Sequence, residues 1–239
     1  MTIAIVLFSG GLDSTACLYW AKERYEHVLL MSFLYGSKED QVIEKINQRF
    51  ANLLSVDSKI INVPFLGEFS QIAGSALSLS TDNIPEFNEF RELDDEKITQ
   101  KSATSVWVPG RNILFLSIAA SAADSLREPV DIIFGANEEE GATFPDNTPD
   151  FVLRMNSAIK LGCLNEVQIL APFSTQIKAE IASFLDRINA SYQYSSSCYQ
   201  IQGWTKKVEP IHCGKCESCL RRKRAFQNNK IDDKTIYVI

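Results

Sequence analysis

The residues at positions 9–14, SGGLDS, are of types that could bind phosphate. They stand between a run of β-branched and bulky apolar residues, which suits a buried strand, and a segment that suits a helix. Such a glycine-rich turn leaves backbone N–H groups unpaired at the positive end of the helix dipole. Gly10 and Gly11 let the backbone approach a ligand closely. Ser9 and Ser14 add hydroxyl donors, so the pattern predicts a phosphate site.

Asp13, which lies inside this turn, limits the kinds of ligand that the turn can bind. The stretch lacks the Gly-Lys-Ser/Thr ending of the Walker loop, so no lysine of the turn would reach the β- and γ-phosphates of a nucleotide. The carboxylate of Asp13 would repel phosphate unless it helps to hold Mg²⁺ or caps the helix. We therefore expect a nucleotide phosphate site that uses Mg²⁺. The alternative is an ordinary strand-to-helix turn with no ligand.

A second chemical feature is a cluster of cysteines near the C-terminus. Cys213, Cys216 and Cys219 form two overlapping C-x-x-C steps, and Cys198 lies upstream of them. Four thiolates complete a tetrahedral shell around Zn²⁺ and leave no position for water, so the predicted zinc is structural. Gly214 permits the tight turn between the first two ligands. A redox disulfide and an iron–sulfur cluster are the alternatives.

Composition limits the class of protein. The chain has 239 residues, of which 45% are hydrophobic, enough for one domain of moderate size with its own core. The net charge of −6 and an isoelectric point of about 5.1 argue against a broad nucleic-acid surface. No apolar run is long enough for a membrane span, and the first residues do not resemble a signal peptide. We therefore expect a cytoplasmic protein.

Apolar runs alternate with segments of helical periodicity along most of the chain. This alternation predicts an α/β protein with a Rossmann-like, doubly wound parallel sheet of five strands. The predicted strands occupy residues 3–8, 28–34, 59–63, 131–135 and 167–171. The predicted helices occupy residues 14–24, 40–54, 112–125, 150–161 and 175–185.

Two stretches depart from this rhythm. Residues 64–107 are dominated by Ser, Thr, Asn and acidic side chains, so we expect an irregular cap over the active site. From residue 195 onward, small polar residues, cysteines and a basic run replace the alternation. The predicted organisation is therefore a nucleotide-binding domain at residues 1–194 and a zinc-binding module at residues 195–239.

SGGLDS resembles the PP-loop, SGGxDS, of the ATP pyrophosphatase superfamily. The resemblance implies an adenine nucleotide alpha hydrolase-like fold. It also implies that the loop holds the pyrophosphate end of ATP while a substrate oxygen attacks the α-phosphate to give an adenylate. The ATP contacts expected on this basis are Phe8, Ser9, Gly10, Gly11, Leu12, Asp13, Ser14 and Lys178.

Three motifs in the same order resemble the 7-cyano-7-deazaguanine synthase (QueC) family. They are the PP-loop, VPGRN at residues 108–112 and CGKCESC at residues 213–219. The resemblance implies an ATP-dependent C–N ligase of queuosine biosynthesis. Such an enzyme activates the carboxylate of 7-carboxy-7-deazaguanine, forms an amide with ammonia, and then activates the amide oxygen to leave a nitrile. It also implies one structural zinc and a homodimer.

The resemblance and residue chemistry together give a predicted catalytic set of Asp13, Arg111 and Lys178. Arg111 can hold a phosphate or carboxylate in bidentate fashion, although a salt bridge at a helix start is the alternative. Lys178, in TQIKAEI, matches a family lysine and would meet ATP phosphates, the alternative being a solvated helical lysine. The predicted substrate-binding residues are Tyr35, Trp107, Pro109, Gly110, Arg111, Asn112, Asn137, Glu140, Phe144 and Asp146.

Two segments depart from the family pattern. The family commonly reads Tyr-Gly-Gln-Arg-His after its second strand, whereas residues 35–39 here are YGSKE. After GANE, Pro145 and Asp146 match, but the family's cysteine and arginine are missing. Because ligands of open α/β sheets bind beyond the carboxyl ends of the strands, these changes bear on the acceptor substrate more than on the fold.

Several functions remain open at this point. The first is synthesis of the amide or nitrile of a 7-deazaguanine, and the second is transfer of the activated base to an amine of a partner protein, as proposed for QueC-like proteins of antiviral defence. Thiolation of tRNA would require a tRNA-binding domain and a reactive cysteine beside the loop, neither of which the sequence indicates. A zinc-stabilised ATP-binding module without catalysis is the last alternative.

Overall fold

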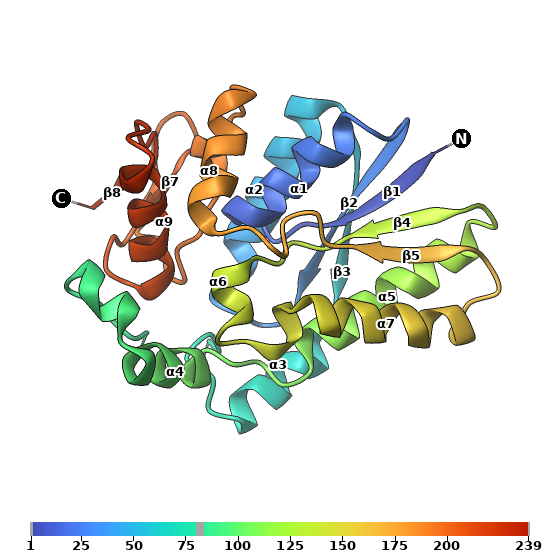
Figure 1. The fold of residues 1–239 in the computed structure, drawn as a ribbon, viewed down its shortest axis with the longest axis horizontal. Coiled ribbons are helices and arrows are strands. Elements are labelled where there is room, and N and C mark those ends of the chain that lie inside the picture. Colours follow the sequence, from blue (N-terminus) through green and yellow to red (C-terminus); the bar gives the residue numbers. More distant parts are fainter. Residues whose placement is uncertain (1, 80–83, 239) are drawn as a thin grey trace.

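A parallel sheet of five strands forms the centre of the molecule (Figure 1), and its strand order is β3-β2-β1-β4-β5. The computed structural model describes residues 2–79 and 84–238. The strands are β1 Ile3–Leu7, β2 His27–Leu34, β3 Asp57–Asn62, β4 Val130–Ile133 and β5 Val167–Leu170. Every pairing between neighbours is parallel. The sheet confirms the predicted α/β fold, with strand ends within a few residues of those expected.

The central strand shows why this sequence forms a sheet buried on both faces. Along β1, Ala4 and Val6 point into one hydrophobic core, while Ile5 and Leu7 point into the other. A strand whose alternate side chains both meet packed helices must be apolar throughout, which explains the continuous apolar run.

Helices cover the two faces in the doubly wound manner (Figure 1). One core is formed with α1 Leu12–Lys22, α2 Asp40–Leu54 and α8 Lys178–Arg187. The other is formed with α5 Arg111–Ser125 and α7 Pro149–Gly162. These five helices are the predicted ones. The N-cap of α1 is Gly11, with no side-chain cap, so the option that Asp13 caps this helix is wrong.

The expectation of an irregular segment at residues 64–107 is wrong for much of its length. The segment contains α3 Pro64–Ile72, a 3₁₀ turn at Phe90–Asp94 and α4 Glu96–Ser105. Local signals explain both helices: α3 begins with proline, and the Asp95 side chain accepts hydrogen bonds from the first turn of α4. The polar composition of α4 and of the residues between the two helices concealed these signals. Residues 80–83 of the expected cap lie outside the described residues.

The C-terminal part of the chain packs against this segment and against α8. It contains a small sheet of β6 Gly203–Trp204, β7 Pro210–His212 and β8 Ile236–Tyr237. Helix α9 Glu217–Asn228 connects β7 to β8 and packs beside α8 (Figure 1). The Phe87 N–H donates to the Lys215 carbonyl oxygen at 2.7 Å. Arg224 forms an ion pair of 2.6 Å with Asp94.

The remaining elements are short: α6 Glu138–Gly141 and 3₁₀ turns at Pro145–Asn147 and Tyr192–Tyr194. Among the helices of residues 2–79 and 84–238, none combines the length and apolar character needed to cross a membrane.

Candidate active site

A cavity of about 230 Å³ opens at the carboxyl ends of the central strands. Residues that follow β1, β2 and β4 line it, together with the start of α5. Between β1 and β4 the strand order reverses direction, and open α/β sheets bind ligands at this switch point. The cavity therefore lies where the fold places a site.

Residues 9–14, SGGLDS, form one wall of this cavity, and the glycines allow the backbone conformation of this turn. Gly10 has φ +78°, and a Cβ atom there would lie 3.0 Å from Cγ2 of Ile46, so no other residue fits without strain. The first hydrogen bond of α1 runs from Thr15 N to Gly11 O at 3.0 Å. The N–H groups of residues 12–14 therefore have no partner within the helix and lie at the positive end of its dipole. The turn has the features of an anion site.

Gly135 supports the turn from the neighbouring strand end, and we predict that Gly135→Ala weakens ATP binding. A Cβ atom at this position would lie 3.2 Å from Ser14 N and 3.4 Å from Ser14 Cα, so the start of α1 must shift. Because misplacement by a fraction of an ångström disrupts several N–H contacts together, KM for ATP should rise about 10-fold. Gly162→Ala is the matched control, since a Cβ atom there meets no atom within 4 Å. Equal KM values for the two variants would refute this role.

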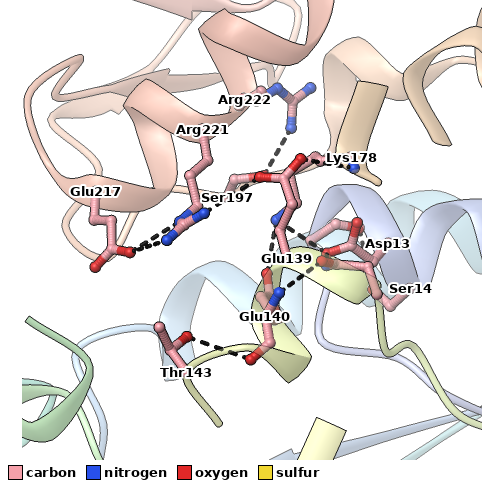
Figure 2. A network of polar contacts seen from close by, with 12 residues as sticks. Asp13, Ser14, Glu139, Glu140, Thr143, Lys178, Ser197, Glu217, Arg221 and Arg222 are labelled. Atoms are coloured by element: carbon pink, nitrogen blue, oxygen red, sulfur yellow. Dashed lines mark hydrogen bonds and ion pairs between the residues drawn. The ribbon is translucent and has the colours of Figure 1, made fainter. Parts of the chain in front are cut away.

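Lys178 holds the loop to a neighbouring turn through carboxylates (Figure 2). It is the first residue of α8, only 2% exposed, and its Nζ lies 2.7 Å from Glu140 Oε1 and 3.2 Å from Asp13 Oδ2. Asn137 Nδ2 donates to the same Asp13 oxygen at 3.2 Å, and Asn137 Oδ1 accepts from Glu140 N at 2.9 Å. The alternative of a solvated helical lysine is therefore wrong.

The charges of this cluster influence one another strongly. Burial raises the pKa of Asp13, although the Lys178 ammonium opposes the rise. Burial acts to lower the pKa of Lys178, but the carboxylates of Asp13 and Glu140 outweigh it and raise that pKa. For Glu140, Lys178 outweighs burial and lowers the pKa. Asp13 Oδ1 is buried and has no hydrogen-bond partner among the described residues. The cluster is therefore incomplete without a cation or donor in the cavity.

A second group of polar side chains lines another part of the cavity. Arg111 begins α5 directly after Gly110, whose φ is +63°. Tyr35, at the end of β2, is 3% exposed, and its Oη has no hydrogen-bond partner in residues 2–79 and 84–238. Burial raises the pKa of Glu39 to about 7, with the nearby Arg111 charge opposing this rise. Burial also raises the pKa of Asp146, again opposed by Arg111.

Aromatic rings accompany these polar groups. The rings of Trp107 and Phe144 are nearly parallel, with centroids 6.2 Å apart and planes inclined by 10°. Phe33 and Phe115 stack with centroids 4.0 Å apart. These rings line the cavity together with the polar groups, and flat aromatic surfaces favour a flat heterocyclic ligand.

The four predicted metal ligands come together in the structure. The Sγ atoms of Cys198, Cys213, Cys216 and Cys219 all lie within 4.8 Å of one another, and those of Cys213 and Cys219 are 3.9 Å apart. Zn–S bonds of about 2.3 Å in a tetrahedron place sulfurs about 3.8 Å apart. Backbone N–H groups, among them Cys213 N at 3.3 Å from Cys198 Sγ, donate to the sulfurs as they do around metal-bound thiolates. The cluster could hold a metal.

The segment before Cys198 reaches the phosphate-binding turn. Ser196 N donates to Gly10 O at 2.7 Å, and the buried Arg222 fixes the residues on either side. Its Nη1 donates to Ser195 Oγ at 2.9 Å and to Ser197 Oγ at 3.2 Å. The cysteine cluster is thus continuous with the wall of the cavity.

We predict that Arg222→Lys lowers stability, because lysine cannot reproduce the planar fork. The guanidinium also donates to Thr235 Oγ1 at 2.8 Å and to Tyr192 O at 3.0 Å. Losing two of these charged hydrogen bonds should cost about 3 kcal/mol in the free energy of unfolding. Denaturant unfolding measures this loss. The exposed Arg187→Lys should change stability by less than about 0.5 kcal/mol, and equal behaviour of both variants would contradict the prediction.

Most residues predicted from the sequence line the cavity. Four of them do not line it, namely Gly10, Pro109, Gly110 and Asn137. Asn137 acts through its hydrogen bond to Asp13. Gly10 and Gly110 allow the positive φ of the backbone at their positions. Their binding roles stay predictions.

Several lining residues come from the C-terminal part and were not predicted as site residues. They are Ser196, Ser197, Tyr199, Glu217, Ser218 and Arg221. Arg221 pairs with Glu217 at 2.8 Å and with Glu139 at 3.2 Å (Figure 2). In the sequence, Arg221 is only one member of a basic run that follows the cysteines. No spacing in the sequence signals its contact with Glu139.

The chain was compared with known proteins. The sequence profile of the family described as "Queuosine biosynthesis protein QueC" matches residues 3–230. The 7-cyano-7-deazaguanine synthase of Pyrococcus abyssi is 48% identical over 239 residues, covering 100% of this chain and 98% of its own. That of Methanococcus maripaludis is 38% identical over 241 residues and covers 99% of each chain.

Solved structures with a similar arrangement are more distant. The U34-tRNA thiolase NcsA of Methanococcus maripaludis has 14% identity and a TM-score of 0.45, with 96% of this chain and 66% of that chain covered. The NH3-dependent NAD synthetase of Campylobacter jejuni has 16% identity and a TM-score of 0.43, with 80% and 65% covered. The profile match and the full-length relatives decide the family: this chain belongs to the QueC family of queuosine biosynthesis proteins.

Proposed function

We propose that this protein is a 7-cyano-7-deazaguanine synthase, which uses ATP to convert 7-carboxy-7-deazaguanine and ammonia into the nitrile in the cytoplasm. Family membership and full-length relatives of that name support the proposal. The observation that carries it is one cavity lined both by a phosphate-binding turn and by an arginine among aromatic rings. Such a cavity offers groups that bind phosphate and groups that bind a planar carboxylate next to one another.

The phosphate-binding turn and Lys178 are proposed to hold ATP. The N–H groups of residues 12–14 face the site of an anion, and Ser9 and Ser14 supply hydroxyl groups. The Lys178 ammonium stabilises charge on the pyrophosphate leaving group while Asp13 and Glu140 position it.

Mg²⁺ is proposed to bind with ATP, and the chain offers groups that fit it. Asp13 Oδ1 is a buried carboxylate oxygen with no hydrogen-bond partner in the part of the chain that the structure describes, and Mg²⁺ prefers such oxygens together with phosphate oxygens. Asp13 and Glu140 carry two negative charges against one positive charge on Lys178, so the ionised cluster attracts a cation. When bound, Mg²⁺ neutralises phosphate charge.

The cysteine cluster is proposed to hold one structural Zn²⁺. Four sulfurs would fill its coordination shell, so the metal supplies rigidity rather than a reactive water. Its position explains how residues 195–197 are kept against the phosphate-binding turn.

The reaction follows from the chemistry of the carboxylate. One carboxylate oxygen attacks the α-phosphorus of ATP and pyrophosphate leaves, because a carboxylate oxygen is itself a poor leaving group. Ammonia then attacks the acyl carbon, AMP leaves with that oxygen, and the amide forms. The amide oxygen attacks the α-phosphorus of a second ATP and a second pyrophosphate leaves. AMP then departs with that oxygen, and loss of the two protons on nitrogen forms the nitrile. Arg111 is proposed to hold the carboxylate in place for attack.

Labelled oxygen tests this function. Purified protein should convert 7-carboxy-7-deazaguanine, ATP and ammonium into the nitrile, and ¹⁸O in the substrate carboxylate should appear in AMP. No turnover without ammonium is expected. Absence of AMP release, or labelled base attached to an added partner protein instead of nitrile, would overturn the proposal.

The homodimer remains a proposal from the family resemblance. Sedimentation equilibrium of the purified chain, whose monomer mass is 26.8 kDa, tests it directly. A single species at the monomer mass at micromolar concentration would refute it.

A further inference from the structure

We propose that the Glu39 carboxylate recognises the N1–H and 2-amino groups of the bound base, and so selects guanine-type over adenine-type or 2-desamino heterocycles. The inference rests on the proposed function and assigns a specificity-determining residue to it. It is carried by the position of Glu39 in the cavity, by its lack of partners and by the donor beside it.

The backbone of Glu39 is fixed while its side chain stays available. Glu39 follows β2 and is the N-cap residue of α2, where its carbonyl accepts from Val42 N at 2.9 Å and Ile43 N at 2.8 Å. Its own N–H donates to Ser37 Oγ at 3.2 Å. Across the described ranges, its carboxylate has neither a hydrogen bond nor an ion pair, although it lines the cavity. A carboxylate held on a rigid backbone and left unpaired in a cavity is suited to a ligand.

The neighbours of Glu39 form a defined pattern of donors and acceptors. Arg111 presents guanidinium donors close enough to influence the Glu39 charge, and Tyr35 adds a buried hydroxyl close to the same guanidinium. This wall therefore places a donor beside a pair of acceptor oxygens. Both residues stand next to or in a regular element that fixes their backbone, since Tyr35 directly follows β2 and Arg111 is the first residue of α5.

A guanine-type ring has the complementary edge. It presents an acceptor oxygen at C6, then donors at N1–H and the 2-amino group, so Arg111 can donate to the first and Glu39 can accept from the others. In a 7-carboxy-7-deazaguanine the 7-carboxylate lies beside the 6-oxo oxygen, so one guanidinium serves both. An adenine-type edge would place a donor against Arg111 and an acceptor against Glu39, which is repulsive at both positions.

The electrostatics of the cavity agree with this arrangement. Burial raises the pKa of Glu39 and Arg111 opposes the rise, while the neighbouring Asp40 adds to it. Two N–H donors from a ligand stabilise the ionised carboxylate in such a setting. When a base without these two donors is bound, the Glu39 carboxylate oxygens remain unpaired and this stabilisation is lost.

Calorimetry with two ligands tests the inference without requiring turnover. The wild-type protein should bind 7-carboxy-7-deazaguanine about 50-fold more tightly than its 2-desamino analogue, as expected for a hydrogen bond to a buried charge. Glu39→Gln should reduce this preference below about 5-fold, because the amide can accept only one of the two donors. The Glu39→Gln variant should lose mainly affinity for 7-carboxy-7-deazaguanine, which carries the 2-amino group, and little affinity for the 2-desamino analogue.

Control variants separate a local effect from damage to the fold. Glu44→Gln changes an exposed residue of the same helix and should keep the full preference. Glu39→Asp keeps the negative charge on a shorter side chain and should retain part of the preference between the two ligands. Thermal midpoints of all variants should agree within about 2 °C.

The outcomes distinguish the two proposals. If Glu39→Gln keeps the wild-type preference, or weakens both ligands equally, the inference is wrong. If the wild-type protein shows the preference but releases no AMP with ammonium and ATP, Glu39 is correctly assigned and the proposed function fails. If the wild-type protein binds neither base, both are overturned.

Discussion

Asp13→Asn should abolish turnover and leave the fold intact. Asparagine keeps the shape of aspartate but removes the charge that Lys178 contacts at 3.2 Å and that a bound cation would need. We expect kcat to fall at least about 10³-fold, the size of effect seen when an electrostatic group is lost from an active site. Assays of AMP and pyrophosphate release measure it.

The expected stability of the same variant follows from the sign of the pKa shift. Because burial raises the pKa of Asp13 in the folded state, ionisation of this group opposes folding at neutral pH rather than favouring it. The neutral amide removes that cost, and Lys178 keeps Glu140 at 2.7 Å. The thermal midpoint should therefore stay the same or rise.

Asp57→Asn provides the control for this experiment, since Asp57 is exposed at the start of β3. It should change neither kcat nor the midpoint. If Asp13→Asn retained more than a tenth of wild-type activity, or unfolded at a clearly lower temperature than the control, the role assigned to Asp13 would be structural.

Cys216→Ala should cost both metal and stability. Without Cys216 the remaining thiolates cannot complete a tetrahedral shell, and metal binding to such a site is also folding free energy. The loss should be on the order of 5 kcal/mol in the free energy of unfolding, which for a chain of this size lowers the midpoint by about 10–20 °C. Metal analysis and thermal unfolding measure the two effects separately.

Loss of the metal should also reach the active site. Residues 195–197 lie between the cluster and Gly10, so their release frees one wall of the phosphate-binding turn. When a chelator removes the metal from the wild-type protein, at a temperature at which the protein stays folded, KM for ATP should therefore rise.

Cys163→Ala serves as the matched control, because this thiol is partly buried and lies outside the cluster. It should keep one metal per chain and lose no more than about 1.5 kcal/mol. A Cys216→Ala protein with the same metal content and thermal midpoint as the wild type would show that the cluster has another role.

The local features of the sequence predicted a large part of the fold. Buried strands and amphipathic helices follow from the order of apolar and polar residues within about ten positions, and α2 begins and ends at the predicted residues. Helix α4 was missed because its polar composition outweighed the capping signal of Asp95. Helix α3 is itself largely apolar, but it was grouped with the polar residues that follow it. Contacts with the C-terminal part, such as the hydrogen bond from Phe87 N to Lys215 O, help to hold the segment at residues 64–107 in place.

By itself, the sequence determined the glycine-rich turn and the four-cysteine cluster, because each depends on short spacings and on residue types with few other uses. Only the tertiary structure decided the surroundings of Lys178, the place of Glu39 in the cavity, and the hydrogen bond from Ser196 to Gly10. These arrangements depend on which strand ends become neighbours in the order β3-β2-β1-β4-β5. That order brings together residues more than a hundred positions apart, as with Asp13 and Asn137, and no local pattern encodes it.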